Sequence, residues 1–407
     1  MFPLSGNGSA SYLNALCKEL LSRGHEIAIV APDKRKVTGV KIYTVKPPHK
    51  GVFHGHPSLP RAKKFADMTG KELGDIYVNY LKTSIEAVDD FSPEIIHVFH
   101  TVFLPPVARV LKMLFGIRII ITTHGSDLQY HAVDRRLNGL VADANRYAAA
   151  ITANSDFTKK LYLDLFGQAL KKKTKVIPGG VNIEVFESSK KYIADINKKY
   201  KLTDKKVVLF TGRLIKSKGI EYLIRAAGHI HGTIVIVGDG PERKILEKQV
   251  KKRKLKNVVF VGYIENKEFL HAFYERADVY VSPTVWEGFG LTIVEAMAAH
   301  TPVIASNQGG IVSIIKNGVN GFMVSPRSGK VIADTVNMLL DDDDLRKKIS
   351  DEAYRTVVEK FTWNKITDEY EKLYREYAFS TAEYLKLVKH DNKKTLKVLR
   401  SLKKLAK

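Results

Sequence analysis

Cysteine is almost absent from this chain of 407 residues, which has only Cys17. One thiol cannot form an internal disulfide, so a small scaffold held together by disulfides is excluded. Cys17 lies in a helical pattern of apolar residues, where a small buried hydrophobe is the simplest interpretation. Because low cysteine use suits a reducing compartment, we expect a cytoplasmic protein.

Long apolar runs and acidic residues are also scarce. No uncharged apolar stretch reaches the length of about 18 residues that a transmembrane helix needs, so none is predicted. The 43 Asp and Glu residues are outnumbered by 66 Lys and Arg residues, which gives a formal net charge of +23. This excess favours anionic partners such as phosphorylated metabolites, nucleic acid or acidic lipid headgroups.

What the sequence has is a regular alternation of short apolar strands with helical patterns, for example at 9–23, 101–115 and 156–166. The strands are nearly continuously apolar, which is typical of parallel sheets covered by helices on both faces. The strands predicted in the first half are HEIAIVAP (25–32), EIIHVFH (94–100), IRIIITTHG (117–125), AAITANS (149–155) and KVIPGG (175–180).

A polar stretch at 187–206 is followed by a second set of β-branched strands. A chain of this length usually forms more than one domain. We therefore predict two doubly wound α/β domains, at 1–186 and 187–360. The strands predicted in the second are KVVLFTGR (206–213), GTIVIVGDG (232–240), NVVFVGY (257–263), ADVYVSP (277–283) and TPVIAS (301–306).

The glycine turn SGNGSAS (5–11) precedes the first helical pattern without a strand before it. A doubly wound domain usually feeds such a turn from its first, central strand. We expect that the native chain starts upstream of Met1, by about five to eight residues, the length of a typical strand. Gly6 and Gly8, with Asp33 after the next strand, also match part of a dinucleotide-binding fingerprint, but Ser11 replaces its third glycine.

Two further turns carry groups that suit a diphosphate. The loop GRLIKSKG (212–219) places Arg213 and Lys218 just after a predicted strand, at the sheet edge where ligands bind in such folds. Arginine holds phosphate through its planar fork and lysine as a point charge. The turn GDGPE (238–242) follows the next strand and offers backbone amides. Each turn alone also fits an ordinary solvated connection.

The segment WEGFGLTIVEAMA (286–298) places Glu287 and Glu295 on either side of a glycine turn. The amides of Phe289, Gly290 and Leu291 would begin a helix, whose N-terminal end attracts anions. A sugar nucleotide needs amides and cations for its diphosphate and carboxylates for its hydroxyls. We interpret the two glutamates as flanking a diphosphate, although in isolation an exposed loop acid and a surface helix acid would be the plainer interpretation.

Together, EGFGLTIVEAMA, GRLIKSKG, IVGDGPE, VFVGYI and PVIAS resemble the retaining sugar-nucleotide glycosyltransferases of family 4. The resemblance covers about residues 3–377 and includes the looser motifs ITTHGSD, ANSDFTKK and VIPGGVNIEVF. It implies the GT-B fold, in which two Rossmann-like domains face each other across a donor cleft. It also implies that a helix at 361–380 crosses back to the N-terminal domain, which leaves a tail at 381–407.

The resemblance assigns roles to individual residues. His124 would face the reacting sugar, Glu287 would bind the donor sugar and Glu295 its ribose, and Arg213 and Lys218 would bind the diphosphate. The remaining implied donor-binding residues are Gly6, Gly8, Gly212, Gly238, Gly262, Tyr263, Ile264, Phe289, Gly290 and Leu291. The chain departs from the family pattern at His300, where a small residue is usual, and in the absence of the first strand.

The implied reaction is transfer of a hexose from a UDP- or GDP-linked sugar to a lipid, lipid-linked or glycan acceptor, without metal or cofactor. Three alternatives stay open: a sugar-nucleotide epimerase or a phosphorylase on the same fold, and a nucleic-acid-binding protein. His49, His54 and His56 lie close together, but no cysteine or nearby carboxylate completes a zinc set. His97 is expected in the core or at a sheet edge, and His100 is a candidate for the acceptor side.

The tail at 381–407 holds nine Lys or Arg residues against two acids, with leucines near helical spacing. Such a basic amphipathic segment suits an anionic membrane surface, where each basic residue contributes about 1 kcal/mol. We hypothesise peripheral docking on the inner face of the cell membrane. A solvated helix or a disordered tail is the alternative.

Overall fold

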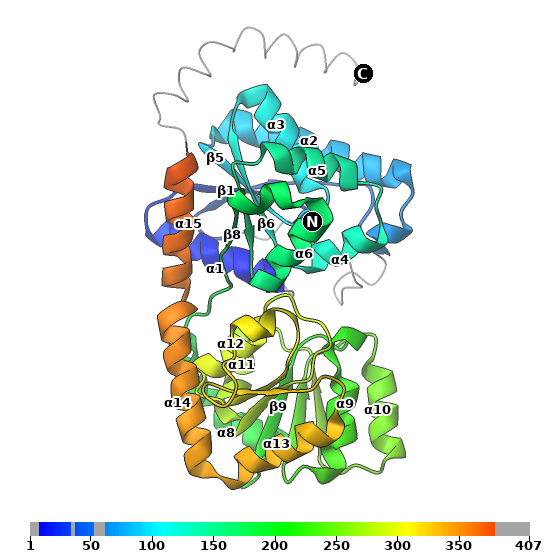
Figure 1. Ribbon diagram of the computed structural model, residues 1–407, viewed down its shortest axis with the longest axis vertical. Coiled ribbons are helices and arrows are strands. Elements are labelled where there is room, and N and C mark those ends of the chain that lie inside the picture. Colours follow the sequence, from blue (N-terminus) through cyan, green and yellow to red (C-terminus); the bar gives the residue numbers. More distant parts are fainter. Residues whose placement is uncertain (1–7, 34–36, 53–61, 379–407) are drawn as a thin grey trace.

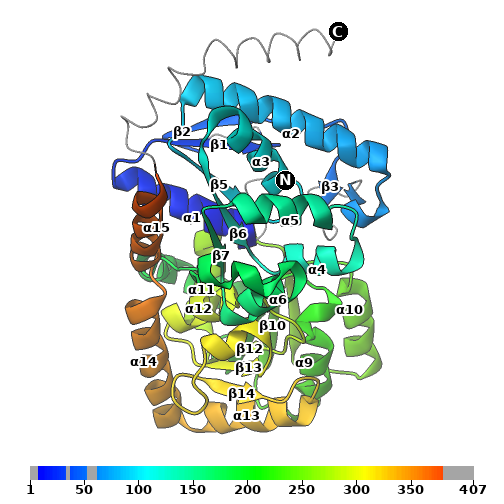
Figure 2. The same cartoon turned by 45° about the horizontal axis from the view of Figure 1, so that its top comes forward.

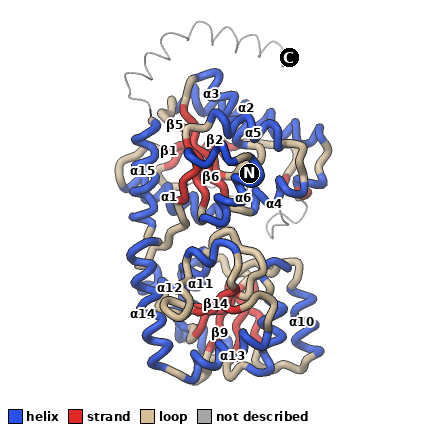
Figure 3. The backbone as a smooth tube through the Cα atoms, viewed as in Figure 1, coloured by secondary structure: helices blue, strands red, loops and turns tan. Residues whose placement is uncertain are grey.

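The computed structural model of the chain describes residues 8–33, 37–52 and 62–378. They form two α/β halves stacked along the long axis of the molecule (Figure 1). In each half the strands lie inside and the helices outside (Figure 3). The predicted α/β class with two parallel sheets is confirmed.

The N-terminal half contains a four-stranded parallel sheet in the order β5-β6-β7-β8, and β1 and β2 form a separate parallel pair. All five strands predicted in this half are present. The helices are α1 (Gly8–Ser22), α2 (Gly70–Phe91), α3 (Leu104–Phe115), α4 (Ser126–Val133), α5 (Asn138–Tyr147) and α6 (Asp156–Phe166). The strands are β1 (Ile27–Ala31), β2 (Val40–Thr44), β3 (Gly51–Val52), β4 (Lys63–Lys64), β5 (Ile95–Phe99), β6 (Arg118–Thr123), β7 (Ala150–Ala153) and β8 (Thr174–Val176).

Local sequence sets the ends of these helices. Thr69 and Glu72 form a reciprocal capping box at the start of α2, and the Ser155 side chain accepts from the Thr158 amide at the start of α6. Gly116, with φ of 73°, ends α3 in the left-handed conformation that glycine adopts without strain. These caps fix where α2 and α6 begin and where α3 ends.

The C-terminal half contains one six-stranded parallel sheet in the order β11-β10-β9-β12-β13-β14. Every residue of β9, β10, β12 and β13 is buried, as expected for strands covered on both faces. The helices are α7 (Glu184–Ser189), α8 (Ile193–Tyr200), α9 (Ile220–Ala226), α10 (Arg243–Lys252), α11 (Lys267–Arg276), α12 (Leu291–Ala298), α13 (Gly329–Asp341), α14 (Asp343–Lys360) and α15 (Trp363–Tyr377). The strands are β9 (Val207–Thr211), β10 (Thr233–Val237), β11 (Val258–Gly262), β12 (Val279–Ser282), β13 (Val303–Ser306) and β14 (Phe322–Val324).

The last helix, α15, packs against the N-terminal half, beside α1 (Figure 2). Its apolar face, with Trp363, Ile366 and Tyr370, joins a buried cluster that includes Tyr12 of α1. On the outer side, the Arg23 guanidinium binds Asp368 at 2.7 Å and Glu371 at 2.8 Å. The chain thus returns to the half in which it began.

His300 follows α12 in the left-handed conformation, with φ of 52°. Its ring stacks on Tyr354 with 3.9 Å between ring centroids. Glycine adopts this conformation more easily than histidine, because it has no Cβ. The stacking contact with α14 accompanies the departure from the family pattern at this position.

Candidate functional site

Three glycines line the carboxyl edge of the C-terminal sheet, at the ends of neighbouring strands. Gly212, Gly238 and Gly262 have φ values of 146°, 135° and 92°. The Gly238 amide donates to the Gly262 carbonyl at 2.8 Å, and a Cβ at Gly238 would lie 1.9 Å from the Gly212 carbonyl oxygen. Only glycine permits such close backbone contact, so these loops pack main chain against main chain at the edge where ligands bind in such folds.

The loop after β9 carries Arg213 and Lys218. The Arg213 Nε atom is buried and has no hydrogen-bond partner among the described residues. Burial lowers the pKa of Arg213 from its ordinary value, yet an arginine stays charged. A buried donor without an acceptor is costly, which suits a side chain whose acceptor is a bound anion.

Lys218 meets Glu287 directly. The Lys218 Nζ atom lies 2.5 Å from Glu287 Oε2, and both side chains are mostly buried. Their loops are joined through the backbone, because the Ser217 carbonyl accepts from the Thr284 hydroxyl and the Val285 amide, each at 2.8 Å. The structure therefore brings these two predicted site residues together as an ion pair.

The turn that carries Glu287 is held from a further side by the glycine pair after β13. The Gly310 amide donates to the Glu287 carbonyl at 2.9 Å, and a Cβ at Gly310 would lie 2.1 Å from the Gly288 carbonyl oxygen. Gly290, with φ of 113°, then leads into α12. The Phe289 side chain is buried, with its ring against Phe361, so only the main chain of Phe289 can serve a ligand.

Glu295 lies one turn into α12 and is anchored to the end of β9. The Tyr274 hydroxyl donates to Glu295 Oε2 at 2.6 Å and lies 2.6 Å from Thr211 Oγ1. Burial raises the pKa of Glu295, and the hydrogen bond from Tyr274 acts in the opposite direction. Glu295 is therefore an oriented carboxyl group at the same sheet edge.

His124 comes from the N-terminal half, directly after β6. Its ring packs against Tyr12, Phe99 and His100, with ring centroids 5.1, 5.9 and 5.0 Å away. Its Nε2 atom is buried without a hydrogen-bond partner among the described residues. Burial lowers the pKa of His124 to about 4, so the imidazole is neutral at pH 7.

Asp127 holds the turn around His124 in place. Its carboxylate accepts from the Thr101 amide at 3.0 Å, the Thr123 hydroxyl at 3.1 Å and the His124 amide at 3.2 Å. Burial raises the pKa of Asp127, but His100, His124 and the hydrogen bond from Thr101 outweigh this and lower it. Asp127 is thus a buried anion that fixes the backbone at His124.

The turns of His124 and Glu287 touch each other across the two halves. The Gly288 carbonyl accepts from the Ser155 hydroxyl at 2.5 Å and from the Thr158 hydroxyl at 3.1 Å. A Cβ at Gly288 would lie 2.8 Å from the His124 carbonyl oxygen. The N-terminal half therefore places His124 next to the turn that carries Glu287.

The remaining residues predicted from the sequence lie at the start of α1, at the end of β11 and in the core of the N-terminal half. Gly8 is the first residue of α1, and Gly6 lies outside the described residues. Gly262 ends β11, Tyr263 is 53% exposed, and Ile264 packs against the core. His97 is held by Tyr374 at 2.7 Å and Thr122 at 2.6 Å.

The histidines considered as metal ligands and the predicted membrane-binding tail are only partly described by the structure. His49 lies near Asp75, with 3.4 Å between Nε2 and Oδ2, whereas His54, His56 and the tail at 381–407 lie outside the described residues. Within the described ranges, no cluster of three or more potential metal ligands occurs. No helix there is both long and apolar enough to cross a membrane.

The sequence gives no role to Asp127, Ser155, Thr158 or Tyr274. For Asp127, Ser155 and Thr158 a signal exists, since they lie in the motifs ITTHGSD and ANSDFTKK, and Ser155 is a recognisable helix cap. The contacts of Thr158 with Gly288 and of Tyr274 with Glu295 depend on how distant segments pack, which local patterns do not reveal.

Comparison with known proteins agrees with this arrangement. Residues 6–185 match the model described as Glycosyltransferase Family 4, and residues 193–356 match Glycosyl transferases group 1. The chain is 31% identical to the uncharacterized glycosyltransferase MJ1607 of Methanocaldococcus jannaschii, over 90% of this chain and 94% of the relative.

Two solved structures are similar in fold. The sucrose-phosphate synthase of Thermosynechococcus elongatus has 25% identity and a TM-score of 0.72, over 92% of this chain and 94% of that one. The Anabaena protein HepE in complex with UDP-glucose has 19% identity and a TM-score of 0.71, over 91% and 97% of the two chains. With sheet architecture, family models and a full-length relative in agreement, the chain belongs to glycosyltransferase family 4, whose GT-B enzymes are retaining and use nucleotide-sugar donors.

Proposed function

We propose that the protein transfers a hexosyl group from a UDP- or GDP-linked sugar to a lipid, lipid-linked or glycan acceptor in the cytoplasm. The donor lies at the carboxyl edge of the C-terminal sheet, against the turn shared with the N-terminal half. No metal or cofactor takes part, because Arg213 and Lys218 supply the positive charge that the diphosphate needs. HepE, which was crystallised with UDP-glucose, supports a nucleoside diphosphate hexose as the donor class.

The observation that carries this proposal is the meeting of Arg213, Lys218 and Glu287 at one edge. The buried Arg213 Nε has no acceptor among the described residues, and Lys218 lies 2.5 Å from Glu287. A diphosphate provides the acceptors that Arg213 lacks, and the first amides of α12 add further donors. Glu287 then accepts a hydrogen bond from a hydroxyl of the sugar, and Glu295 accepts one from a hydroxyl of the ribose.

The chemistry follows from charge development during bond cleavage. The bond between the anomeric carbon and the diphosphate oxygen breaks, and its electron pair leaves with the diphosphate. Arg213, Lys218 and the α12 amides stabilise that charge, a contribution that is usually the largest single one in such sites. The acceptor oxygen attacks the same face, and its proton passes to the departing phosphate oxygen, so the anomeric configuration is retained.

His124 faces the reacting sugar in this proposal. A buried neutral imidazole with a pKa of about 4 is no general base near pH 7, since its conjugate acid is too strong. Its unpaired Nε2 instead provides a hydrogen-bond partner for a sugar hydroxyl. Neither glutamate is needed as a nucleophile or as an acid–base pair.

A panel of UDP- and GDP-linked hexoses in a thermal-shift assay, followed by product NMR, tests this function. We expect one nucleotide series to raise the Tm and the matching sugar to be transferred with retention. Glu287→Gln should lose transfer, whereas Glu265→Gln, in an exposed loop after β11, is the matched control.

Other outcomes would replace the proposal. Absorbance near 330 nm from a lysine-bound pyridoxal group would indicate a phosphorylase. Conversion of the sugar nucleotide without an acceptor would indicate an epimerase. A gel shift that weakens with salt, together with no response to any sugar nucleotide, would indicate nucleic-acid binding. Co-sedimentation with anionic liposomes, with and without residues 381–407, tests peripheral membrane docking, and equal pelleting of both forms, or of neither, would contradict it.

A further inference from the structure

Tyr12 of α1 contacts both the His124 site and the start of the returning helix α15. Its ring meets the His124 ring edge-on, with 5.1 Å between the centroids and 74° between the planes. It also meets the Trp363 side chain edge-on, with 4.9 Å between the centroids. Tyr12 is 4% exposed, so it forms a buried link between the imidazole and α15.

The chain passes from the N-terminal half to the C-terminal half after β8 and returns after α14 (Figure 1). These crossing segments, residues 177–182 and 361–363, lie side by side. The Val181 amide donates to the Phe361 carbonyl at 2.8 Å, and the Trp363 amide donates to the Val181 carbonyl at 3.2 Å. Because any change in the angle between two domains is absorbed by the segments that join them, these residues are where such a change would occur.

The Tyr12 hydroxyl is bonded to the first crossing segment and to α15. It donates to the Pro178 carbonyl at 3.1 Å and lies 2.8 Å from the hydroxyl of Tyr370, which is fully buried. A carbonyl can only accept, and the Tyr12 hydroxyl has one proton, so Tyr370 is the donor in the second bond. The far end of the ring that packs on His124 is therefore held from two directions.

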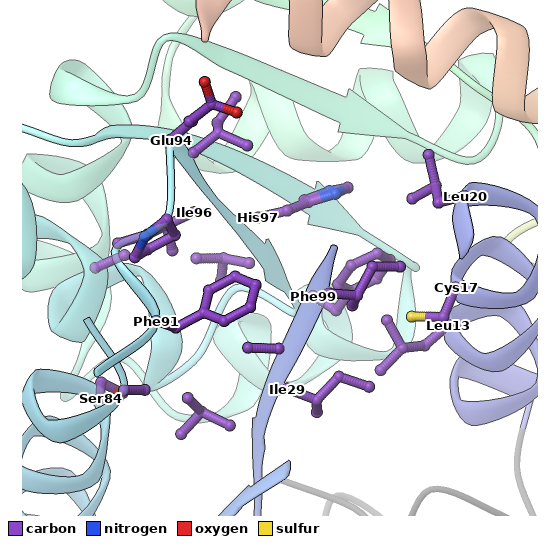
Figure 4. A pocket seen from close by; sticks show the side chains of 18 of the residues that line it. Leu13, Cys17, Leu20, Ile29, Ser84, Phe91, Glu94, Ile96, His97 and Phe99 are labelled. Atoms are coloured by element: carbon purple, nitrogen blue, oxygen red, sulfur yellow. The ribbon is translucent and has the colours of Figure 1, made fainter. Parts of the chain in front are cut away.

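A further hydrogen bond fixes the register of α15 on the N-terminal sheet. The Nδ1 atom of His97 lies 2.7 Å from the Tyr374 hydroxyl. His97 and Phe99 both project from β5 toward α1, where they line a cavity of about 700 Å³ (Figure 4). Hydrogen bonds are directional, so this one limits sliding and rotation of α15. The helix therefore presents Tyr370 to Tyr12 in a defined position.

The His124 ring depends on packing for its orientation. Its Nε2 atom has no hydrogen-bond partner among the described residues, and Asp127 holds the His124 amide rather than the ring. The rings that surround it in the described part of the chain belong to Tyr12, Phe99 and His100. Of these three, Tyr12 is the one that is bonded to a crossing segment and to α15.

We propose that Tyr12 is a positioning residue for sugar transfer: it couples the arrangement of the crossing segments to the orientation of His124. This inference rests on the proposed function, in which His124 faces the reacting sugar. In the arrangement observed here, Pro178 and Tyr370 hold the Tyr12 ring against the imidazole. A rearrangement of the crossing segments moves that ring and leaves the imidazole unsupported. Nucleotide binding does not pass through Tyr12, because the diphosphate and ribose residues lie in the C-terminal half.

Three substitutions separate the ring of Tyr12 from its hydroxyl. Tyr12→Leu removes the ring, Tyr12→Phe removes only the hydroxyl, and Tyr370→Phe removes only the group that donates to it. Tyr374→Phe is the matched control, because it removes a hydroxyl of the same helix that bonds His97 instead of Tyr12. For each variant, kcat is measured with the donor found in the thermal-shift panel, and the Kd of UDP or GDP is measured by calorimetry.

The value of kcat should fall about 10²-fold in Tyr12→Leu and about tenfold in Tyr12→Phe and in Tyr370→Phe, since small misplacements of a group beside the substrate have effects of this size. The nucleotide Kd should stay within about twofold throughout, as should kcat in Tyr374→Phe. Adding Tyr370→Phe to Tyr12→Phe should cause no further loss, because the acceptor of the Tyr370 proton is already gone.

A kcat within about twofold of the native value in both Phe variants would overturn the proposal, even where Tyr12→Leu fails to fold. So would an equal loss of nucleotide affinity, or losses that multiply in the double variant, because either result indicates a general structural effect.

A second measurement does not depend on activity. The imidazole NMR resonances of His124, assigned with His124→Asn, report its surroundings in the protein without substrate. Tyr370 is not among the described ring partners of His124, so Tyr370→Phe should shift these resonances only through Tyr12. The shift should vanish in the Tyr12→Phe background. No shift, or a shift that persists in that background, would rule out this route. The expected shifts without transfer of any sugar nucleotide would support the route and contradict the proposed function.

Discussion

The two halves of the molecule differ in how continuous their β-sheets are. The C-terminal half has one unbroken six-stranded sheet, whereas the N-terminal half has separate pieces around a cavity of about 700 Å³. Arg213 and Lys218 lie in the loop after β9, at the carboxyl edge of this six-stranded sheet. His124 follows β6, inside the four-stranded piece and away from its open edge.

This difference shows where each part of the site obtains its rigidity. The donor loops are fixed by backbone contacts between adjacent strand ends, such as that between Gly238 and Gly262. His124 is fixed by the buried carboxylate of Asp127 and by the contact of its turn with Gly288. Binding of the nucleoside diphosphate should therefore depend mainly on the C-terminal half, whereas placement of the sugar and transfer depend on both halves.

The largest expected effect on activity comes from the cationic loop. Lys218→Ala should lower kcat/KM about 10²- to 10³-fold, because it removes one charge that stabilises the leaving diphosphate. Lys216→Ala, in the same loop but exposed, is the matched control and should stay within about twofold. Steady-state kinetics with the donor found in the thermal-shift panel measure both. Near-normal transfer by Lys218→Ala would remove this residue from the site.

The next effect concerns the stability of the unbroken sheet. Gly238→Ala should lower the free energy of unfolding by about 3 kcal/mol, since its φ is 135° and its Cβ would meet the Gly212 carbonyl oxygen at 1.9 Å. Gly228→Ala is the control, because its Cβ would meet only Leu255, at an ordinary 3.7 Å. Denaturant unfolding compares them. Equal stability of the two variants would contradict the close packing of the strand-end loops.

The third prediction concerns the pH dependence of stability, which should arise from the buried histidines His100 and His124 of the N-terminal half. Burial lowers the pKa of His100 to about 3 and that of His124 to about 4. The unfolded chain binds these protons near pH 6.5, so stability should fall as pH decreases from about 6.5 toward 4. Each histidine contributes a slope of about 1.4 kcal/mol per pH unit.

Unfolding measured between pH 7 and 5 should therefore show a weaker pH dependence in His124→Asn than in the native protein. Val312→Ala, an exposed change of a non-titrating residue in the C-terminal half, should leave the slope unaltered. A slope that is the same in all three proteins would mean that His124 is protonated as readily in the folded as in the unfolded state.

The smallest expected effect concerns the support of Glu295. Tyr274→Phe removes the hydroxyl that donates to Glu295 and should lower stability by about 1 kcal/mol, with a further rise in the pKa of Glu295. Donor KM should rise while kcat changes little, because ribose binding is the same in ground and transition states. Tyr354→Phe, which lies outside the site, is the control. A fall in kcat with unchanged KM would argue against a ribose role.

Much of the fold could be predicted because buried parallel strands leave a strong pattern. Segments such as VVLFT and TIVIV are apolar at nearly every position, and the structure places β9 and β10 there. The sequence shows no comparable signal at β14, which has only three residues, or at the half-buried β2. Short or partly exposed strands lack the pattern that identifies long buried ones.

The positions of the candidate site residues at the sheet edge could be predicted, but their contacts could not. Arg213, Lys218, Glu287 and Glu295 lie at the expected sheet edge, because strand ends and helix starts can be located from sequence. The pairing of Lys218 with Glu287 spans 69 positions, and the contact of Ser155 with Gly288 spans 133. Such contacts depend on how elements pack across the sheet and between halves, which local patterns do not contain.

The most direct test of the donor site is a crystal structure of the protein soaked with UDP and GDP. The diphosphate should lie within hydrogen-bonding distance of the Arg213 guanidinium, the Lys218 ammonium and the first amides of α12, with the ribose against Glu295. A nucleotide bound elsewhere, with Arg213 still lacking an acceptor, would contradict the assignment.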